Sequence, residues 1–411
     1  MAERYTVRKE TLEAIASAVR NKNHSTSQMT PSEIKTAIDN LDVEEDYEWR
    51  KPADWPDLES IQLPGSWEES TLYFLYDKKC GIDEVSIYCS TTNRRIYKGT
   101  VVGGEFVGEL VLDTGRPYTF TDTLEDEYTV YKIVIYAESG CRFDKGVTRS
   151  YGWADQGCVW VYGEVPTFSY IGGDPTCSLL TPYLRRMYLI HAKKLWFTFP
   201  SNRFSQGTGY DISVSYVCGY EEPNDWGNLP VGRTGNGPIT PPIKQKSDFI
   251  LRNVNFQNFY TKASITARNV VLVNPSGTMK NGQYQDSYLI EKFVVQGGTM
   301  KCSSMYYMFS YCINLVTCDM HDVDFSEMTQ SAGAFNMCHK LKNLRLNSTW
   351  AVDLNLGSCA ELSRESILGI INDLPVVETA KKLTLSVYAK FNANITDEEL
   401  AIATNKGWTV A

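Results

Sequence analysis

The strongest pattern of hydrophobic positions along the chain is a repeat near its carboxyl end. The stretch MFSYCINLVTCDM at 308–320 superposes on AFNMCHKLKNLRL at 334–346 with a constant offset of 26 residues. A third, shorter copy keeps the spacing Cys-x-x-Leu from Cys359. In a solenoid, side chains at equivalent positions of successive turns stack on one another, so the pattern predicts a stacked core. The residues expected in this repeat core are Phe309, Cys312, Leu315, Cys318, Phe335, Cys338, Leu341, Leu344, Cys359 and Leu362.

The cysteines of the repeat could be metal ligands, a disulfide or packing residues, and the superposition favours packing. Cys312 aligns with Cys338, whereas Cys318 aligns with Leu344, so a cysteine takes the place of a hydrophobic residue. The chain has 11 cysteines and no CxxC pair, and no further ligand lies close to Cys338-His339 in the sequence. We therefore expect reduced, buried thiols, no metal and no other cofactor.

Short apolar segments recur through this region at steps of about 22 to 26 residues, the range of leucine-rich repeats. They predict strands at 249–254, 270–273, 292–295, 316–320 and 343–346. The chain then departs from the repeat, as a cap would. It predicts a helix with Ser363 or Ser366 near its N-cap, a last strand in 381–387, and a closing helix with Thr396 as N-cap. Residues 248–411 are therefore predicted to form a leucine-rich-repeat solenoid with a helical cap.

Alternating apolar and polar positions predict strands in the middle of the chain. Residues 129–137 (TVYKIVIYA) alternate most clearly, and 94–113 reads as two strands around a Gly-Gly turn. Frequent turns between short strands favour an antiparallel, sandwich-like domain for 48–145. Residues 146–247 are rich in aromatic residues, Gly and Pro, and they predict further β structure with a long loop.

Residues 1–42 have apolar positions at helical spacing and predict two short helices. The second begins with Thr30 as N-cap, Pro31 at the first helical position and Glu33 three residues after the cap. Helices this short do not hold a core of their own, so we expect them to bury their apolar stripes against a partner. The predicted fold class is multi-domain α+β: a short N-terminal helical segment, a β-rich, sandwich-like middle, and a C-terminal leucine-rich-repeat solenoid with a helical cap.

Composition narrows the classes of function. A net charge of −9 argues against nucleic-acid binding, which needs a basic surface. The first residues, MAERYTVRKE, contain no apolar core of a signal peptide, so we expect synthesis in a cytoplasm. No run of apolar residues approaches the length of a membrane span, so we expect no membrane insertion.

The sequence predicts no catalytic residue. Its four histidines are scattered, and it contains no GxSxG, HExxH or P-loop pattern. Acidic residues among aromatic ones, such as Asp155, Glu164 and Asp174, leave carbohydrate hydrolysis open, because glycoside hydrolases use paired carboxylates.

Aromatic residues are the candidate ligand contacts, since their faces bind sugars and form hot spots of protein interfaces. Trp153 and Trp226 lie in segments rich in Gly, Pro and Asp and are the better candidates for exposure, together with Tyr170. Trp160 and Tyr162 stand in the apolar run CVWVYGEV, which favours a place in a sheet core.

Three segments, in order, carry a resemblance to known proteins. Met308-Phe309, Cys312 and Leu315 match the MF-x-x-C-x-x-L motif of BspA-like leucine-rich repeats. The ending, ELSRESILGIINDL through ITDEELAIATNKGWTVA, resembles the closing segment of such repeats in bacteriophage virion proteins. The beginning, TVRKETLEAIASAVRNK and MTPSEIKTAIDNL, is similar to N-terminal segments of phage tail and baseplate-associated proteins, and RKPADWPDL resembles a recurring entry segment of that group.

The resemblance implies a virion structural protein of the tail-fibre, tail-tip or baseplate type, on the outer surface of the particle. Residues 1–42 would attach it to other virion proteins, and later domains would bind a glycan or protein of the host surface. A homo-oligomer, with a trimer expected, would add avidity. The alternatives are a head-decoration or collar protein without a receptor role, and a polysaccharide-cleaving tail enzyme. We disfavour a bacterial surface adhesin, because the first residues do not resemble a signal peptide.

Overall fold

The structure, a computed structural model, describes residues 51–65, 69–78, 84–89, 94–115, 118–136, 141–144, 158–164, 167–171, 186–199, 202–219, 246–256, 268–279, 282–287 and 290–411. Contacts between residues divide the chain into Met1–Lys51 and Pro52–Ala411. The helical segment predicted at 1–42 lies outside the described residues, so it stays a prediction, as do the predicted domain boundaries.

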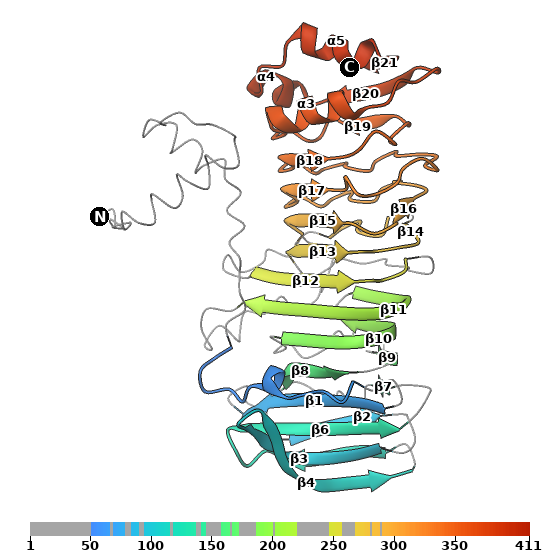
Figure 1. Cartoon of the computed structure of the whole chain (residues 1–411). Helices are drawn as coiled ribbons and strands as arrows, with labels where there is room; N and C mark the ends of the chain where they lie inside the picture. The colour runs from blue at the N-terminus through green and yellow to red at the C-terminus, as the bar shows by residue number, and fades with distance from the viewer. Residues whose placement is uncertain are drawn as a thin grey trace, which may run out of the picture. The chain divides into compact units, whose positions relative to one another are not determined.

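The described part of Pro52–Ala411 is β-rich with few helices (Figure 1). Its first half comprises η1 (Leu58–Ser60), β1 (Glu69–Asp77), β2 (Glu84–Cys89), β3 (Arg94–Val102), β4 (Glu105–Thr114), β5 (Tyr118–Thr123), β6 (Tyr128–Tyr136), β7 (Cys141–Asp144), β8 (Cys158–Glu164), β9 (Thr167–Ile171), β10 (Arg186–Phe199) and β11 (Asn202–Gly219). Its second half comprises β12 (Lys246–Arg252), β13 (Asn269–Val273), β14 (Thr278–Met279), β15 (Lys292–Gln296), β16 (Lys301–Cys302), β17 (Thr317–Asp319), β18 (Asn343–Arg345), β19 (Leu354–Leu356), α3 (Arg364–Asp373), β20 (Lys381–Leu385), α4 (Val387–Asn392), α5 (Asp397–Thr404) and β21 (Trp408–Val410).

One sheet joins most of these strands edge to edge, in the order β4-β3-β6-β1-β8-β10-β11-β12-β13-β15-β17-β18 (Figure 1). Strands β2, β5, β7 and β9 join the same sheet off this path. The pairing along the first half of the path is antiparallel, except that β8 and β10 run parallel. From β12 to β18 every pairing is parallel.

The core of the antiparallel part contains every second residue of β6. Tyr131, Ile133 and Ile135 are fully buried, and the ring of Phe120 from β5 packs edge-on against Tyr131 with centroids 5.8 Å apart. Strand β2 adds the buried side chain of Val85 to the same core. The strands β2 and β5 therefore supply apolar cover for the residues that alternate inward from β6.

The predicted two strands around a Gly-Gly turn are the hairpin β3–β4. Val102 pairs with Glu105, and Gly103 and Gly104 between them have φ angles of 61° and 84°. Two residues with positive φ form the two-residue turn that matches the twist of a hairpin, and glycine adopts them at no steric cost.

The C-terminal region is β-solenoid-like, and all five strands predicted in it are present, as β12, β13, β15, β17 and β18. Their register places one inward residue of each strand in a single row. The buried residues of this row, from turn to turn, are Phe249, Val270, Phe293, Cys318 and Leu344. Cys318 is thus paired directly with Leu344, the residue that the 26-residue offset places opposite it.

Each strand of the first turns ends at a corner in the left-handed region of the backbone. Asn253 follows β12, Asn274 follows β13 and Gly297 follows β15, with φ angles of 60°, 49° and 63°. Asn and Gly are the residues that adopt this conformation most readily. The backbone N–H of Asn274 donates to the carbonyl oxygen of Gln296 at 2.8 Å, so the corners also stack from turn to turn.

The spacing Phe-x-x-Cys-x-x-Leu arises from consecutive three-residue turns. The N–H of Cys312 donates to the carbonyl oxygen of Phe309 at 3.0 Å, and the N–H of Leu315 donates to that of Cys312 at 3.0 Å. Cys338 and Leu341 repeat this pattern one turn later. Residues three apart in such turns lie on one side of the chain, so Phe, Cys and Leu all point into the core.

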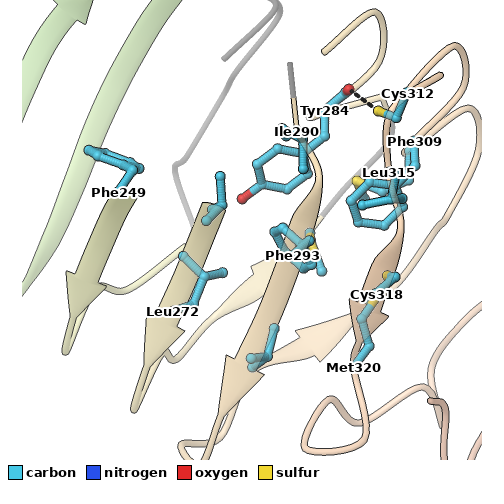
Figure 2. Packing of buried hydrophobic residues seen from close by; sticks show 14 of the residues in the cluster. Phe249, Leu272, Tyr284, Ile290, Phe293, Phe309, Cys312, Leu315, Cys318 and Met320 are labelled. Atoms are coloured by element: carbon cyan, nitrogen blue, oxygen red, sulfur yellow. Dashed lines mark hydrogen bonds between the residues drawn. The ribbon is translucent and has the colours of Figure 1, made fainter. Parts of the chain in front are cut away.

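The aromatic residues of these turns form a column. The ring of Phe309 lies parallel to that of Tyr284, with centroids 5.5 Å apart, and parallel to that of Phe335, with centroids 5.7 Å apart. Figure 2 labels Tyr284, Phe293 and Phe309 among the buried residues. Phe293 from β15 meets Phe309 edge-on at 5.0 Å. The ten residues expected in the repeat core are all buried, each with at most 3% of its surface exposed.

The thiols bind the backbone of the preceding turn. Cys312 Sγ donates to the carbonyl oxygen of Tyr284 at 3.1 Å, as the dashed line in Figure 2 shows, and Cys338 Sγ donates to that of Phe309 at 3.1 Å. Cys359 Sγ lies 3.9 Å from the carbonyl oxygen of Phe335. These cysteines are free and buried. Each thiol therefore packs in the core and links two successive turns.

The end of the solenoid is closed by α3, whose N-cap is Ser363. The Ser366 hydroxyl in its first turn accepts the N–H of Leu344 in β18 at 3.0 Å and donates to the carbonyl oxygen of Lys342 at 3.0 Å. Helix α5 begins with the predicted capping box, in which the side chains of Thr396 and Glu399 bind each other's backbone N–H. The strands β19, β20 and β21 form a separate parallel sheet beside these helices.

Candidate ligand-binding surface

Three exposed tyrosines lie on one turn of the solenoid, between β16 and β17. Tyr306, Tyr307 and Tyr311 are 40%, 36% and 41% exposed, while Met308, Phe309 and Ser310 between them are fully buried. We call Tyr306, Tyr307 and Tyr311 the tyrosine surface. Most of the other large hydrophobic side chains of this turn point inward, so the tyrosines are the part of the turn that a ligand can reach.

The backbone of the tyrosine surface is strained. Tyr307 and Tyr311 have φ angles of 50° and 62°, in the left-handed region. A bulky residue is uncommon there, and each such residue costs roughly 1–3 kcal/mol. The adjacent turns use glycine at the position of Tyr307, namely Gly282 with φ 62° and Gly333 with φ 68°. A tyrosine at this position therefore opposes the local backbone preference.

The hydrogen bonds between turns impose this conformation. The N–H groups of Tyr307 and Tyr311 donate to the carbonyl oxygens of Ala332 and Asn336 in the next turn, at 3.0 and 2.8 Å. On the other side, the carbonyl oxygen of Tyr306 accepts the N–H of Gly282 at 2.9 Å. The chain at Tyr307 and Tyr311 must follow the turns on both sides, whatever side chain it carries.

The rings of the surface have fixed neighbours. Those of Tyr306 and Tyr307 meet edge to face, with centroids 4.5 Å apart and planes at 86°. A Cβ atom at Gly333 would lie 2.8 Å from the Cδ1 and Cε1 atoms of Tyr307, so the Tyr307 ring rests against this glycine. The aromatic faces are thereby presented in a defined arrangement rather than as free side chains.

The turns around the tyrosine surface carry little charge. The segment 302–312 and the aligned segment 328–338 of the next turn contain no Asp, Glu, Lys, Arg or His, and the aligned segment 277–287 of the preceding turn contains one Lys and one Asp. The surface thus combines aromatic faces with phenolic hydroxyls, and the aligned segments have no net charge.

The outward face of the parallel sheet has a different character, because its polar side chains bind one another. Arg345 Nη1 donates to Asp319 Oδ2 at 2.9 Å, and Asn269 Nδ2 donates to Asp248 Oδ1 at 2.6 Å. These pairs follow the register of the strands, and their hydrogen bonds occupy the polar groups that would otherwise bind a ligand. We therefore place the candidate site on the tyrosine surface.

None of the aromatic residues considered as ligand contacts from the sequence belongs to the tyrosine surface. Trp153 and Trp226 lie outside the described residues. Tyr170 lies on β9, and its side chain is not among the described ones. Trp160 and Tyr162 are buried on β8, and the Tyr162 ring stacks on Tyr73 with centroids 6.3 Å apart. Burial raises the pKa of Tyr162 to about 12, as expected for a phenol inside a core.

The carboxylates considered for hydrolysis do not form a described pair. Glu164, at the end of β8, is buried, and its Oε2 accepts the backbone N–H of Gly65 at 2.8 Å. Asp155 and Asp174 lie outside the described residues. Within the described ranges, three or more His, Cys, Asp or Glu side chains nowhere gather as a metal site would require. No described helix has the length and apolarity needed to cross a membrane.

Comparisons of the chain with protein families, curated proteins and solved structures found no match. The sequence did contain a signal for the tyrosine surface. The 26-residue offset aligns Tyr306, Tyr307 and Tyr311 with Ala332, Gly333 and Met337, and large aromatic residues at variable positions of a repeat indicate an outward surface.

Proposed function

We propose that the chain is a non-enzymatic adhesion protein of a bacteriophage particle, of the tail-fibre, tail-tip or baseplate type. The observation that carries this proposal is the tyrosine surface, an exposed, strained and uncharged aromatic group on a stacked scaffold. Binding residues are typically held on loops by a rigid framework, and local backbone strain gathers at functional sites. The resemblance of three sequence segments to phage proteins supplies the setting.

The β-solenoid-like region would be a BspA-like leucine-rich-repeat domain, as the motif Met308-Phe309, Cys312 and Leu315 suggests, and the middle would be sandwich-like. The predicted helices of 1–42 would attach the chain to other virion proteins at the particle surface. A homo-oligomer, with a trimer expected, would convert weak single contacts with a host glycan or protein into avidity.

Two measurements test this function. Gold-labelled antibodies against 151–240 should mark the tail end of intact particles, and purified full-length chain should compete with particles for adsorption to host cells. Labelling of heads or collars, without competition, would instead indicate a decoration protein. Release of reducing ends from host polysaccharide, lost on changing one acidic residue, would indicate a tail enzyme.

A further inference from the structure

We propose that the tyrosine surface binds a neutral saccharide of the host surface, with pyranose C–H faces stacked on the rings of Tyr306, Tyr307 and Tyr311. This inference rests on the proposed adhesion function and names its ligand class and its residues. It places the contacts on the solenoid rather than on the aromatic residues upstream.

The tyrosines lie at positions where the scaffold does not require an aromatic residue. The turns on both sides have glycine in place of Tyr307, and the next turn has alanine in place of Tyr306 and methionine in place of Tyr311. The scaffold thus forms the same backbone with smaller or more flexible residues, and at the position of Tyr311 both adjacent turns share the positive φ. A large aromatic side chain at the position of Tyr307, where both adjacent turns have glycine, indicates selection for what the side chain contacts.

The backbone of the turn limits which partner can bind. A peptide strand cannot add to this turn, because its backbone groups are occupied on both sides. The N–H groups of Met305 and Phe309 donate to the next turn, as those of Tyr307 and Tyr311 do, and the carbonyl oxygens of Met308 and Ser310 accept from the preceding turn.

Charge argues against the other common ligands of an aromatic platform. Single-stranded nucleic acids stack on aromatic rings but need a basic groove for their phosphates, and the aligned segments 277–287, 302–312 and 328–338 together contain one Lys and no Arg. One Asp balances this Lys, so the segments favour neither an acidic nor a basic ligand. A neutral pyranose matches the surface, because its C–H face stacks on a ring and its hydroxyls can bind phenolic hydroxyls.

The decisive variant converts this turn to the residues of the next one. In the full-length chain, Tyr306→Ala, Tyr307→Gly and Tyr311→Met together reproduce Ala332, Gly333 and Met337. This triple variant should fold with an unchanged or higher melting temperature, since Gly relieves the strained φ at position 307. The matched control is Tyr388→Ala, which removes a tyrosine on α4 that is 73% exposed and lies outside the turn.

Binding is measured with fluorescently labelled chain on host cells that are untreated, oxidised with periodate or digested with protease. It is also measured by surface plasmon resonance against neutral polysaccharide purified from the same cells. Wild type and Tyr388→Ala should bind both, and the triple variant should bind at least about tenfold more weakly, as expected for loss of several hot-spot contacts. Periodate should abolish cell binding, and protease should leave it.

Each other outcome has a definite meaning. A folded triple variant that binds as well as wild type would refute the assignment of the tyrosine surface. Binding that survives periodate but is lost after protease would show that the surface binds a protein and would refute the saccharide inference alone. Failure of the wild-type chain to bind any host cells would refute the adhesion function and the inference together. If the triple variant misfolds, the single variant Tyr311→Met is measured in the same binding assays. Binding by this variant as strong as that of wild type would refute the assignment of the tyrosine surface.

Discussion

Buried thiols should make the solenoid unstable in alkali. Burial raises the pKa of Cys312, Cys318 and Cys359 well above their ordinary value, and it raises the pKa of Cys302 and Cys338 to about 12. The thiol form is favoured in the folded protein, so its contribution to stability is complete below the unfolded pKa near 9.0. That contribution is lost as the pH rises from about 9 toward the folded pKa.

The size of the effect follows from proton linkage. A thiol that ionises at 9.0 when unfolded, but stays protonated when folded, lowers the free energy of unfolding by about 1.4 kcal/mol between pH 7 and pH 10. The five thiols with raised pKa values together would contribute roughly 7 kcal/mol, which is comparable to the whole stability of a typical domain.

The matched variant is Cys312→Ser, because Ser287 occupies the equivalent position one turn earlier and is fully buried. Urea unfolding followed by circular dichroism, with a non-thiol reductant present, should show that wild type loses about 1.4 kcal/mol more than Cys312→Ser between pH 7 and pH 10. The reverse change, Ser287→Cys, adds a buried thiol and should steepen the loss. Identical pH dependence in all three proteins would refute the view that these positions hold protonated thiols in the core.

Three further predictions follow from the packing and the caps. Phe309→Ala should lower the free energy of unfolding by about 3–5 kcal/mol, since the ring is stacked on both sides; a loss below about 1 kcal/mol in urea unfolding would contradict the column. Thr396→Ala should cost about 1 kcal/mol, whereas Thr396→Ser should cost little, and hydrogen exchange in α5 would report both; equal protection would argue against the capping box. Removal of residues 1–42 should leave the rest folded by circular dichroism but absent from purified particles, and normal incorporation would disprove the proposed anchor.

The solenoid-like region could be predicted because its information is local and periodic. The 26-residue offset alone places Cys318 opposite Leu344, and the three-residue turns explain the spacing of Phe309 and Cys312. The N-cap at Thr396 could also be predicted from the sequence, because capping depends on side chains a few residues apart. Where one turn repeats the contacts of the last, the sequence of a single turn specifies the register of the next.

The remaining features depend on contacts that the local pattern does not specify. The antiparallel pairing of β1 with β8 joins residues as far apart in the chain as Thr71 and Glu164, and short-range alternation does not choose a partner strand. The strain at Tyr307 was invisible for another reason. Its sequence neighbours do not favour a left-handed backbone, which is imposed by the turns that it pairs with. The left-handed backbone at this tyrosine therefore became clear only when the turns were stacked.

The two ends of the solenoid show how sheet edges determine the extent of a repeat. The edge of β12 is paired with β11 over seven residues in antiparallel register, from Ser213↔Arg252 to Gly219↔Lys246. The opposite edge, at β18, is covered by the first turn of α3, where the Ser366 hydroxyl binds both an N–H and a carbonyl group of the strand segment. An unpaired parallel edge would recruit other strands, so a stack needs a cap at each end. The change of pattern near 248 therefore marks a change from antiparallel to parallel pairing within one continuous sheet, and β11 serves as the first cap of the solenoid.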